Sequence, residues 1–307
     1  MALQLHSILH STLASFSAAD LEESISHFSI QAVGVATAAI VVLVGLAILL
    51  NKRMPSVKPL LFMLIVVVAT GTTLAISGAT VYLNVKSAAG GPVHWHADIE
   101  IWACDNELEL RDPQGFLSNK IGSATLHEHN DKRIHLEGVP VSLPDDASLG
   151  KFMRVIGGEV SDNSLVVPLN DEGHFEDDHA EMDGDGAAAE YAGQIAPHVL
   201  TEKDGKYGKF ISGQTCGDET AEVQVFAYKY DRDSKTYKQS KISDPEHYQI
   251  SGYSEVPPGD CVIMEFAPAK DRTDKLCRQY GVRDAERCEA FGVLPNERKI
   301  CENKEVL

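Results

Sequence analysis

Two long uncharged segments near the start of the chain limit what it can fold into. Residues 30–50 read IQAVGVATAAIVVLVGLAILL and residues 59–83 read PLLFMLIVVVATGTTLAISGATVYL, with no charged side chain in either. About 20 apolar residues suffice for a helix to cross the hydrocarbon core of a membrane. Two such runs joined by a short basic loop predict a transmembrane hairpin over residues 30–83 rather than core helices of a soluble domain. The lack of ionisable residues within them disfavours a channel, pump or proton path.

The charges that flank the two runs predict their orientation. The joining loop contains Lys52, Arg53 and Lys58, whereas the first 29 residues contain no Lys or Arg. Short loops rich in Lys and Arg remain in the cytoplasm. We therefore expect a two-pass protein of the plasma membrane whose N-terminus and C-terminal domain both lie outside. Residues 1–29 would form an extracytoplasmic lead-in, either a short amphipathic segment or a disordered tail. Residues 84–92 would form a flexible linker.

The segment that follows the second run is strongly acidic. Three of the 27 Lys and Arg residues and three of the 45 Asp and Glu residues precede residue 86, so residues 86–307 carry the whole formal charge of −18. Such a domain repels nucleic acid and anionic lipid headgroups, and it attracts cations. Metal ions and cationic proteins of the cell envelope are therefore the expected partners, and nucleic acid is not. A dense acidic run at residues 171–185 fits a solvated loop better than a calcium site, because its spacing is not that of an EF-hand.

All six cysteines lie in this same acidic segment, which is predicted to be on the oxidising side of the membrane. An even number of cysteines in that compartment usually forms disulfides. No CxxC motif is present, so neither a thiol redox pair nor a zinc ribbon is indicated. The pairing is open, with Cys277 and Cys288 the most plausible local pair. The candidates are Cys104, Cys216, Cys261, Cys277, Cys288 and Cys301.

The pattern of the exported segment predicts an α+β domain with a mixed sheet over residues 93–268. Residues 93–103 alternate apolar and polar side chains, and residues 221–230 and 260–267 also read as strands. Residues 145–158 (DDASLGKFMRVIGG) predict a short helix that Asp146 or Ser148 can cap and Gly157 can end. We expect loops and short elements in residues 159–217, as in an insertion, and a helical, cysteine-containing tail over residues 269–307.

Histidines recur at regular spacing in two parts of this domain. His94 and His96 are two residues apart on a predicted strand, so their side chains leave the same face about 6–7 Å apart. His127 and His129 repeat this spacing in a predicted hairpin. If the hairpin loop is residues 130–132, His127 lies opposite His135; a two-residue loop would instead send His135 to the other face. The loop length therefore decides whether a fifth histidine joins the group.

Clustered imidazoles without a thiolate are compatible with Zn, Cu, Fe or Ni. We predict a site for a transition metal ion of the Zn or Cu class whose ligands are His94, His96, His127, His129 and His135. Nearby carboxylates would orient the rings through hydrogen bonds. The candidates for that role are Asp98, Glu100, Glu128 and Glu137. The alternative is a metal-free cluster of hydrogen-bonded or pH-responsive histidines.

The order of motifs HWHADIEIW, LHEHNDKRIHLEG, ASLGKFMRVIGG and VPPGDCVIMEF resembles a group of exported or membrane-anchored bacterial and archaeal domains. Those domains have an HxHA strand, an HTHD-like hairpin leading to IHxE, a TLGxFF-like helix and a closing GDxIxIxY strand. The resemblance covers residues 92–158 and 221–267. It implies an α+β fold with an ending similar to that of β-grasp folds, and it implies no reaction. HEH in place of HTH and the long stretch between Gly158 and Ala221 depart from the pattern.

Three functions are consistent with these patterns. The first is a membrane-anchored domain that binds a transition metal for capture, delivery or sensing. The second is a non-enzymatic interaction or structural module of the envelope with a metal-free histidine cluster and an unidentified protein partner. The third is a metal-dependent enzyme, since HWHADIE spells the HxHxxxE ligand core of cupins. The flanking glycines and the second cupin motif are missing, and no GxSxG or other nucleophile motif is present, so catalysis is the least favoured.

Overall fold

The computed structural model describes residues 18–50, 54–114, 118–170, 195–202, 205–231, 233–234, 236–255, 259–278 and 280. The chain divides into two compact units, one formed by Met1–Pro92 with Val139–Ser142 and the other by Val93–Gly138 with Leu143–Leu307. The acidic run 171–185, Cys288, Cys301 and most of the lead-in and tail lie outside the described residues.

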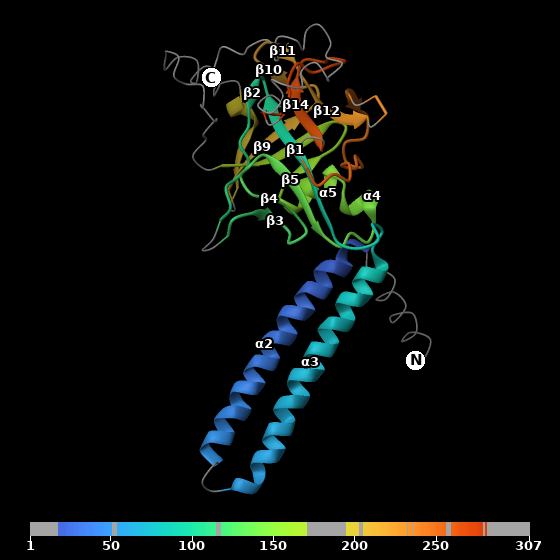
Figure 1. Ribbon diagram of the computed structural model, residues 1–307. Helices are drawn as coiled ribbons and strands as arrows, with labels where there is room; N and C mark the ends of the chain where they lie inside the picture. Colours follow the sequence, from blue (N-terminus) through green and yellow to red (C-terminus); the bar gives the residue numbers. More distant parts are fainter. Residues whose placement is uncertain are drawn as a thin grey trace, which may run out of the picture. The chain divides into compact units, whose positions relative to one another are not determined.

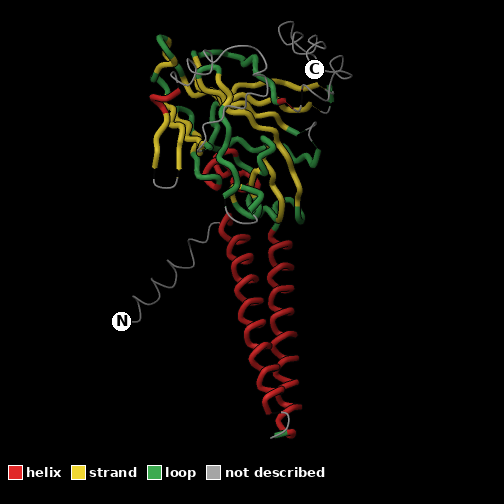
Figure 2. Tube along the Cα trace, turned by 90° about the vertical axis from the view of Figure 1, so that its left-hand side faces the viewer, coloured by secondary structure: helices red, strands yellow, loops and turns green. Residues whose placement is uncertain are grey.

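The first unit contains two long helices that run side by side (Figures 1 and 2). Helix α2 spans Ala18–Leu50 and helix α3 spans Lys58–Lys86, with the short 3-10 helix η1 at Pro55–Val57. Both helices are long and apolar enough to cross a membrane, α2 from Ser24 onward. Their apolar side chains, such as Val35 and Val85, are largely exposed. The prediction of two long apolar helices is confirmed, although the first begins earlier and includes residues 18–29.

The second unit is built on an eight-stranded mixed sheet, as predicted. Its strand order is β13-β12-β14-β1-β5-β4-β3, and β2 pairs with β1. The central strand β1 is parallel to β14 and antiparallel to β5, and the three lie next to one another in Figure 1. The strands are β1 Val93–Ala103, β2 Asn106–Glu107, β3 Ile121–Gly122, β4 Leu126–Glu128, β5 Arg133–Gly138, β12 Glu222–Asp231, β13 Thr236–Ile242 and β14 Asp260–Ala267.

The region expected to contain loops and short elements forms a second sheet of short strands. Its order is β6-β7-β9-β8, all antiparallel. Fragmentary alternation and the acidic run between β7 and β8 concealed these strands in the sequence. They are β6 Glu159–Val160, β7 Ser164–Leu169, β8 Val199–Glu202 and β9 Gly205–Ile211, with the 3-10 helix η2 at Ala196–His198 before β8 and the pair β10 Thr215–Cys216 and β11 Glu219–Thr220 after β9.

The hydrophobic core brings one face of the main sheet together with the second sheet and helix α5 (Leu149–Val155), which follows the one-turn helix α4 (Leu143–Asp146). The Ser148 hydroxyl caps α5 by accepting a hydrogen bond from the backbone N–H of Lys151 at 3.1 Å. Gly157 then adopts a φ of 92°, which favours glycine after a helix. The predicted apolar face of this helix is buried, as expected: Leu149, Phe152, Met153 and Ile156.

Two disulfides fix the ends of strands β1 and β14. Cys104 bonds to Cys216, and Cys261 bonds to Cys277. The predicted pairing of Cys277 with Cys288 is therefore wrong. Residues 270–277 are also not helical. The bond to Cys261 and a hydrogen bond from the Thr273 hydroxyl to the Glu265 carboxylate at 2.7 Å hold this segment along β14, and these contacts outweigh its local helix propensity.

Removing the two disulfides should destabilise the domain to different extents. A disulfide that closes a longer loop restricts the unfolded chain more. The sequence separations are 112 residues for Cys104–Cys216 and 16 for Cys261–Cys277, which correspond to stabilisation of the folded state by about 5 and about 3 kcal/mol. We expect fragment 87–307 with Cys104→Ser and Cys216→Ser to lose more unfolding free energy than the fragment with Cys261→Ser and Cys277→Ser. Urea denaturation measures both losses, and a larger loss for the second pair would contradict this account.

Candidate metal centre

Three neighbouring strands bring three histidines into one row across the main sheet. His135 on β5 pairs in register with His96 on β1 and with His127 on β4. Strand residues alternate between faces, so Ala97, Ile134 and Leu126 point to the core and the imidazoles to the opposite face. The hairpin follows the three-residue-loop register, in which His127 faces His135. The structure therefore includes His135 in the histidine group.

The hairpin loop is held by the side chain that precedes it. The Glu128 carboxylate accepts hydrogen bonds from the backbone N–H groups of Asp131 at 2.6 Å and Lys132 at 3.1 Å. Asn130 and Lys132 adopt φ values of 64° and 57°, a left-handed conformation that a tight loop imposes. Burial raises the pKa of Glu128. Glu128 thus fixes the loop, where the sequence suggested that it would orient a ring.

Four side chains converge at the exposed end of this row. His94, His96, His135 and Glu137 each offer a ligand atom within 4.8 Å of the others, and we call them the outer group. The His94 Nε2 atom lies 2.8 Å from Glu137 Oε1 and 3.0 Å from His96 Nε2. A ring nitrogen carries at most one hydrogen, which cannot point at both neighbours. One hydrogen on His94 Nε2 therefore cannot serve both the contact with His96 and the contact with Glu137, and a cation shared by these side chains would stabilise the arrangement.

A second set, which we call the inner group, consists of His127, His129 and His135, again with ligand atoms within 4.8 Å of one another. The rings of His127 and His135 stack with centroids 5.5 Å apart, and His129 meets both edge-on. His127 is fully buried, and neither of its ring nitrogens has a hydrogen-bond partner among the described residues. A buried polar group left in this way costs about 1–3 kcal/mol. The Glu137 carboxylate lies 3.9 Å from His127 Nε2, too far for a hydrogen bond, so a bound cation would be a favourable partner for this ring.

Backbone carbonyls set the tautomers of two of these rings. His96 Nδ1 lies 2.7 Å from the carbonyl oxygen of Ser254, and His129 Nδ1 lies 2.8 Å from that of Asn119. A carbonyl only accepts, so both Nδ1 atoms carry the hydrogen and donate. In the neutral ring the Nε2 lone pair is then available, and this orientation by a second hydrogen bond is typical of metal-binding histidines.

Asp131 completes the site and was missed by sequence reasoning. The His135 Nε2 atom lies 3.1 Å from Asp131 Oδ2. The other ring nitrogen, Nδ1, is buried and has no hydrogen-bond partner among the described residues. It lies 3.9 Å from Glu137 Oε1. Burial opposes ionisation of Asp131, but the hydrogen bond and charge of His135, helped by Arg133, lower its pKa. An anionic carboxylate behind a ring that offers its other nitrogen to a metal is a common arrangement. The contact between Asp131 and His135 depends on the register of the hairpin loop, which the sequence does not determine.

Burial keeps two of the rings neutral. It lowers the pKa of His127 to about 4, with smaller contributions from Lys120, His129 and His135 that outweigh the opposing Glu137 carboxylate. Burial also lowers the pKa of His96, against the hydrogen bond to Ser254 and with the charges of His135, His94 and Arg133. Neutral imidazole is the metal-binding form, so protons compete weakly for these ligands at neutral pH.

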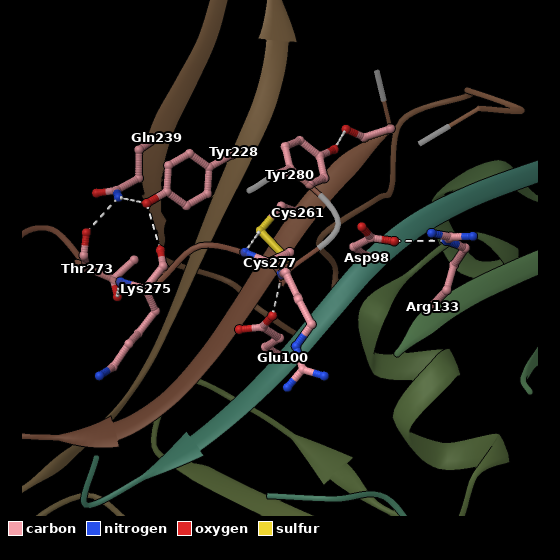
Figure 3. Close-up of a disulfide and its surroundings, with 12 residues drawn as sticks. Asp98, Glu100, Arg133, Tyr228, Gln239, Cys261, Thr273, Lys275, Cys277 and Tyr280 are labelled. Atoms are coloured by element: carbon pink, nitrogen blue, oxygen red, sulfur yellow. Dashed lines mark hydrogen bonds and ion pairs between the residues drawn. A yellow bond between two sulfur atoms is a disulfide. The ribbon is translucent and has the colours of Figure 1, made fainter. Parts of the chain in front are cut away.

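Of the four carboxylates expected to orient the rings, only Glu137 lies within a histidine group. Asp98 pairs with Arg133 at 2.8 Å, and Glu100 accepts hydrogen bonds from the Trp102 indole and the Arg278 backbone. Figure 3 shows Asp98 directed at Arg133 and Glu100 beside the Cys261–Cys277 disulfide. Among the described residues, Asp98, Glu100 and Glu128 belong to neither group.

Gly122 is a further residue that the sequence pattern did not reveal. It pairs with His127 across β3 and β4 at a φ of 109°, and a Cβ atom there would lie 2.6 Å from the Leu126 carbonyl oxygen and 3.0 Å from His127 Cα. The close approach of β3, which buries His127, therefore requires glycine at this position.

Comparisons with family models, with curated proteins and with solved structures found no match for this chain.

The buried carboxyl of Glu100 should make stability depend on pH. Burial, together with the charge of Glu107, raises its pKa from 4.5 to about 7, against its hydrogen bonds and Lys132. The folded state binds the proton more tightly than the unfolded state, so the unfolding free energy falls as pH rises from about 4.5 to about 7, by about 3 kcal/mol. We expect Glu100→Gln in fragment 87–307 to remove this part of the pH dependence in urea denaturation.

The exposed residue Glu219 provides the matched control for that experiment. Glu219→Gln should leave the pH dependence of stability as in the wild type. A Glu100→Gln variant whose stability follows the wild-type pH curve between 4.5 and 7 would show that Glu100 titrates as an ordinary glutamate.

Proposed function

We propose that this chain is a membrane-anchored domain that binds a transition metal ion outside the cytoplasm, for metal capture, delivery or sensing. The observation that carries the proposal is His127: a fully buried imidazole with no hydrogen-bond partner among the described residues, stacked in a group of three histidine rings. A metal ion would satisfy one of its nitrogens. The acidic composition of residues 86–307 supports cation binding as well.

The ligand set favours Zn or Cu. Imidazole nitrogens with one carboxylate, Glu137, suit these borderline ions, whereas Ca and Mg require mainly oxygen ligands. The tautomers set by Ser254 and Asn119 leave Nε2 of His96 and His129 available for coordination. The proposal thus rests on both the type and the orientation of the donor atoms.

A metal-free histidine cluster in an envelope interaction module is the alternative. The pairs His94–Glu137 and His135–Asp131 favour it, because each is a satisfactory ion pair or hydrogen bond without a metal. Under the alternative, His127 has no hydrogen-bond partner among the described residues and only a long ion-pair contact, 3.9 Å from its Nε2 atom to Glu137 Oε2. We therefore rank it second.

A metal-dependent enzyme is the third function. Asp131, which contacts His135, also lines a cavity of about 210 Å³ together with Asp98, Glu100 and Lys132. A substrate could occupy such a space beside a metal ion. Catalysis would require an open coordination position on that ion, whereas a closed set of protein ligands would favour storage or delivery.

The orientation in the membrane is part of the proposal. The Lys and Arg residues of the loop between the two long apolar helices support a cytoplasmic position for that loop. The two disulfides support an oxidising compartment for the strand-rich unit. The protein would then lie in the plasma membrane with both chain ends outside.

The chain, purified without a histidine tag and with its disulfides intact, should bind Zn²⁺ or Cu²⁺ stoichiometrically after reconstitution. His135 belongs to both groups, so His135→Gln should weaken binding by more than about 10-fold. Calorimetric titration measures the affinity, and elemental analysis measures the amount bound. His247→Gln is the matched control, because His247 is exposed and pairs with Asp244 outside both groups. Absence of stoichiometric metal after reconstitution with either ion would refute the proposal.

The proposed orientation has a separate test. A protease added outside intact cells or spheroplasts should cleave within residues 86–307 and leave the loop at residues 51–58 uncut, because the membrane shields that loop. Immunoblotting of the fragments shows which side of the membrane each segment occupies. Full protection of residues 86–307 would show that the orientation is the reverse.

A further inference from the structure

The two metal-competent groups share one ring. His135 belongs to the outer group with His94, His96 and Glu137, and to the inner group with His127 and His129. Its ring centroid lies 4.8 Å from that of His96 and 4.9 Å from that of His129. His135 is therefore in contact with both sides, and any ion bound by either group would lie next to it.

The two groups differ in their access to solvent. The side chains of His94 and Glu137 are 61% and 40% exposed, whereas that of His127 is 1% exposed. An ion in the outer group would meet water and external molecules, while an ion in the inner group would lie against the buried rings of His127 and His135, with the half-buried His129 as its third ligand. The exposed fraction thus falls along the row from β1 to β4.

The charge available at the site supports one divalent ion rather than two. The carboxylates that contact these rings are Glu137 and Asp131. Glu137 lies 2.8 Å from His94 Nε2 in the outer group and 3.9 Å from His127 Nε2 in the inner group, and Asp131 lies 3.1 Å from His135 Nε2. Together they balance a single dication. Two dications sharing His135 would repel each other strongly at this short separation in a partly buried site. Moreover, one imidazole can coordinate two ions only when neither ring nitrogen carries a proton. His135 Nε2 lies within hydrogen-bond distance of the Asp131 carboxylate, which favours a proton on that nitrogen.

Building on the metal binding proposed above, we infer that a single Zn²⁺ or Cu²⁺ ion moves between the two groups, with His135 as the ligand common to both. The outer group exchanges the ion with solution or with a partner's ligands, and the inner group retains it. No covalent or redox step is involved: imidazole and carboxylate ligands are replaced one at a time. Such a two-position site separates fast capture from slow loss.

Matched double variants of the full chain in detergent test this inference with Zn²⁺ alone. His94→Asn with His96→Asn removes two imidazoles from the outer group, and His127→Asn with His129→Asn removes two from the inner group. Elemental analysis gives the ions bound per chain, and stopped-flow transfer to a chromophoric zinc chelator gives the release rate. Thermal unfolding checks that each variant is folded. If the inner double variant does not fold because His127 is buried, His129→Asn alone replaces it.

We expect one ion per chain in the wild type and in both double variants. The outer variant should release zinc more slowly than the wild type, because the ion loses its exposed position for exchange, and the inner variant should release it more rapidly, because the retaining position is lost, each by about 10-fold or more. His135→Gln should weaken binding in either background. Two ions per chain in the wild type would overturn the inference in favour of a dinuclear site. Loss of binding in one double variant with no change in the other would overturn it in favour of a single fixed site.

The failure of the underlying proposal gives a different result. If the wild-type chain binds no zinc at stoichiometric level, and no copper in the same assay, metal binding itself is refuted. The outcomes above that overturn the two-position site all require that the wild type binds zinc.

Discussion

The register between β4, β5 and β1 is the constraint on which the site depends. A slip of one residue in β5 would exchange its two faces, with His135 turned into the core and Ile134 and Leu136 turned outward. Each of these apolar side chains contributes about 1.5–3 kcal/mol when buried, so the slip is strongly opposed. Glu128 adds local control by binding the backbone of the hairpin loop. The hydrophobic face of the sheet thereby positions the imidazoles on the other face.

Burial of His127 keeps its ring neutral, and it also costs free energy because the ring nitrogens lose hydrogen bonds to water. Enclosure by β3, made possible by Gly122, keeps His127 neutral at physiological pH, which suits a ligand for Zn or Cu. The same enclosure leaves both ring nitrogens without a hydrogen-bond partner among the described residues. A purely structural position would be served better by an apolar side chain of similar size. The cost is understandable if a bound ion supplies the missing partner.

Local periodicity predicted the strands, the α5 helix and the two HxH pairs, because each of these depends on neighbours in sequence. Pairing in space was not predictable in the same way. Asp131 joins His135 only across the hairpin loop, Cys277 bonds to Cys261 rather than to the nearer-looking Cys288, and Glu137 approaches His94 only through the β1–β5 register. The second sheet was missed because its strands are short and interrupted by an acidic run. Three of the four carboxylates chosen by proximity in sequence have structural partners instead.

The outer face of the main sheet changes character along β1, and this change explains how the histidines are held. Beyond the histidines comes the Asp98–Arg133 ion pair, and then an aromatic cluster of Phe226, Tyr228 and Tyr280 around the Cys261–Cys277 disulfide. The C-terminal half of β1 is thus packed on both faces, and the neighbouring strand β14 carries the Cys261–Cys277 disulfide. At the N-terminal end of β1, His94 is exposed. Ligands on a braced strand remain close to their binding geometry, which reduces the entropy lost on binding. Freedom to exchange ligands is then concentrated at the exposed end of the row, where an ion would enter.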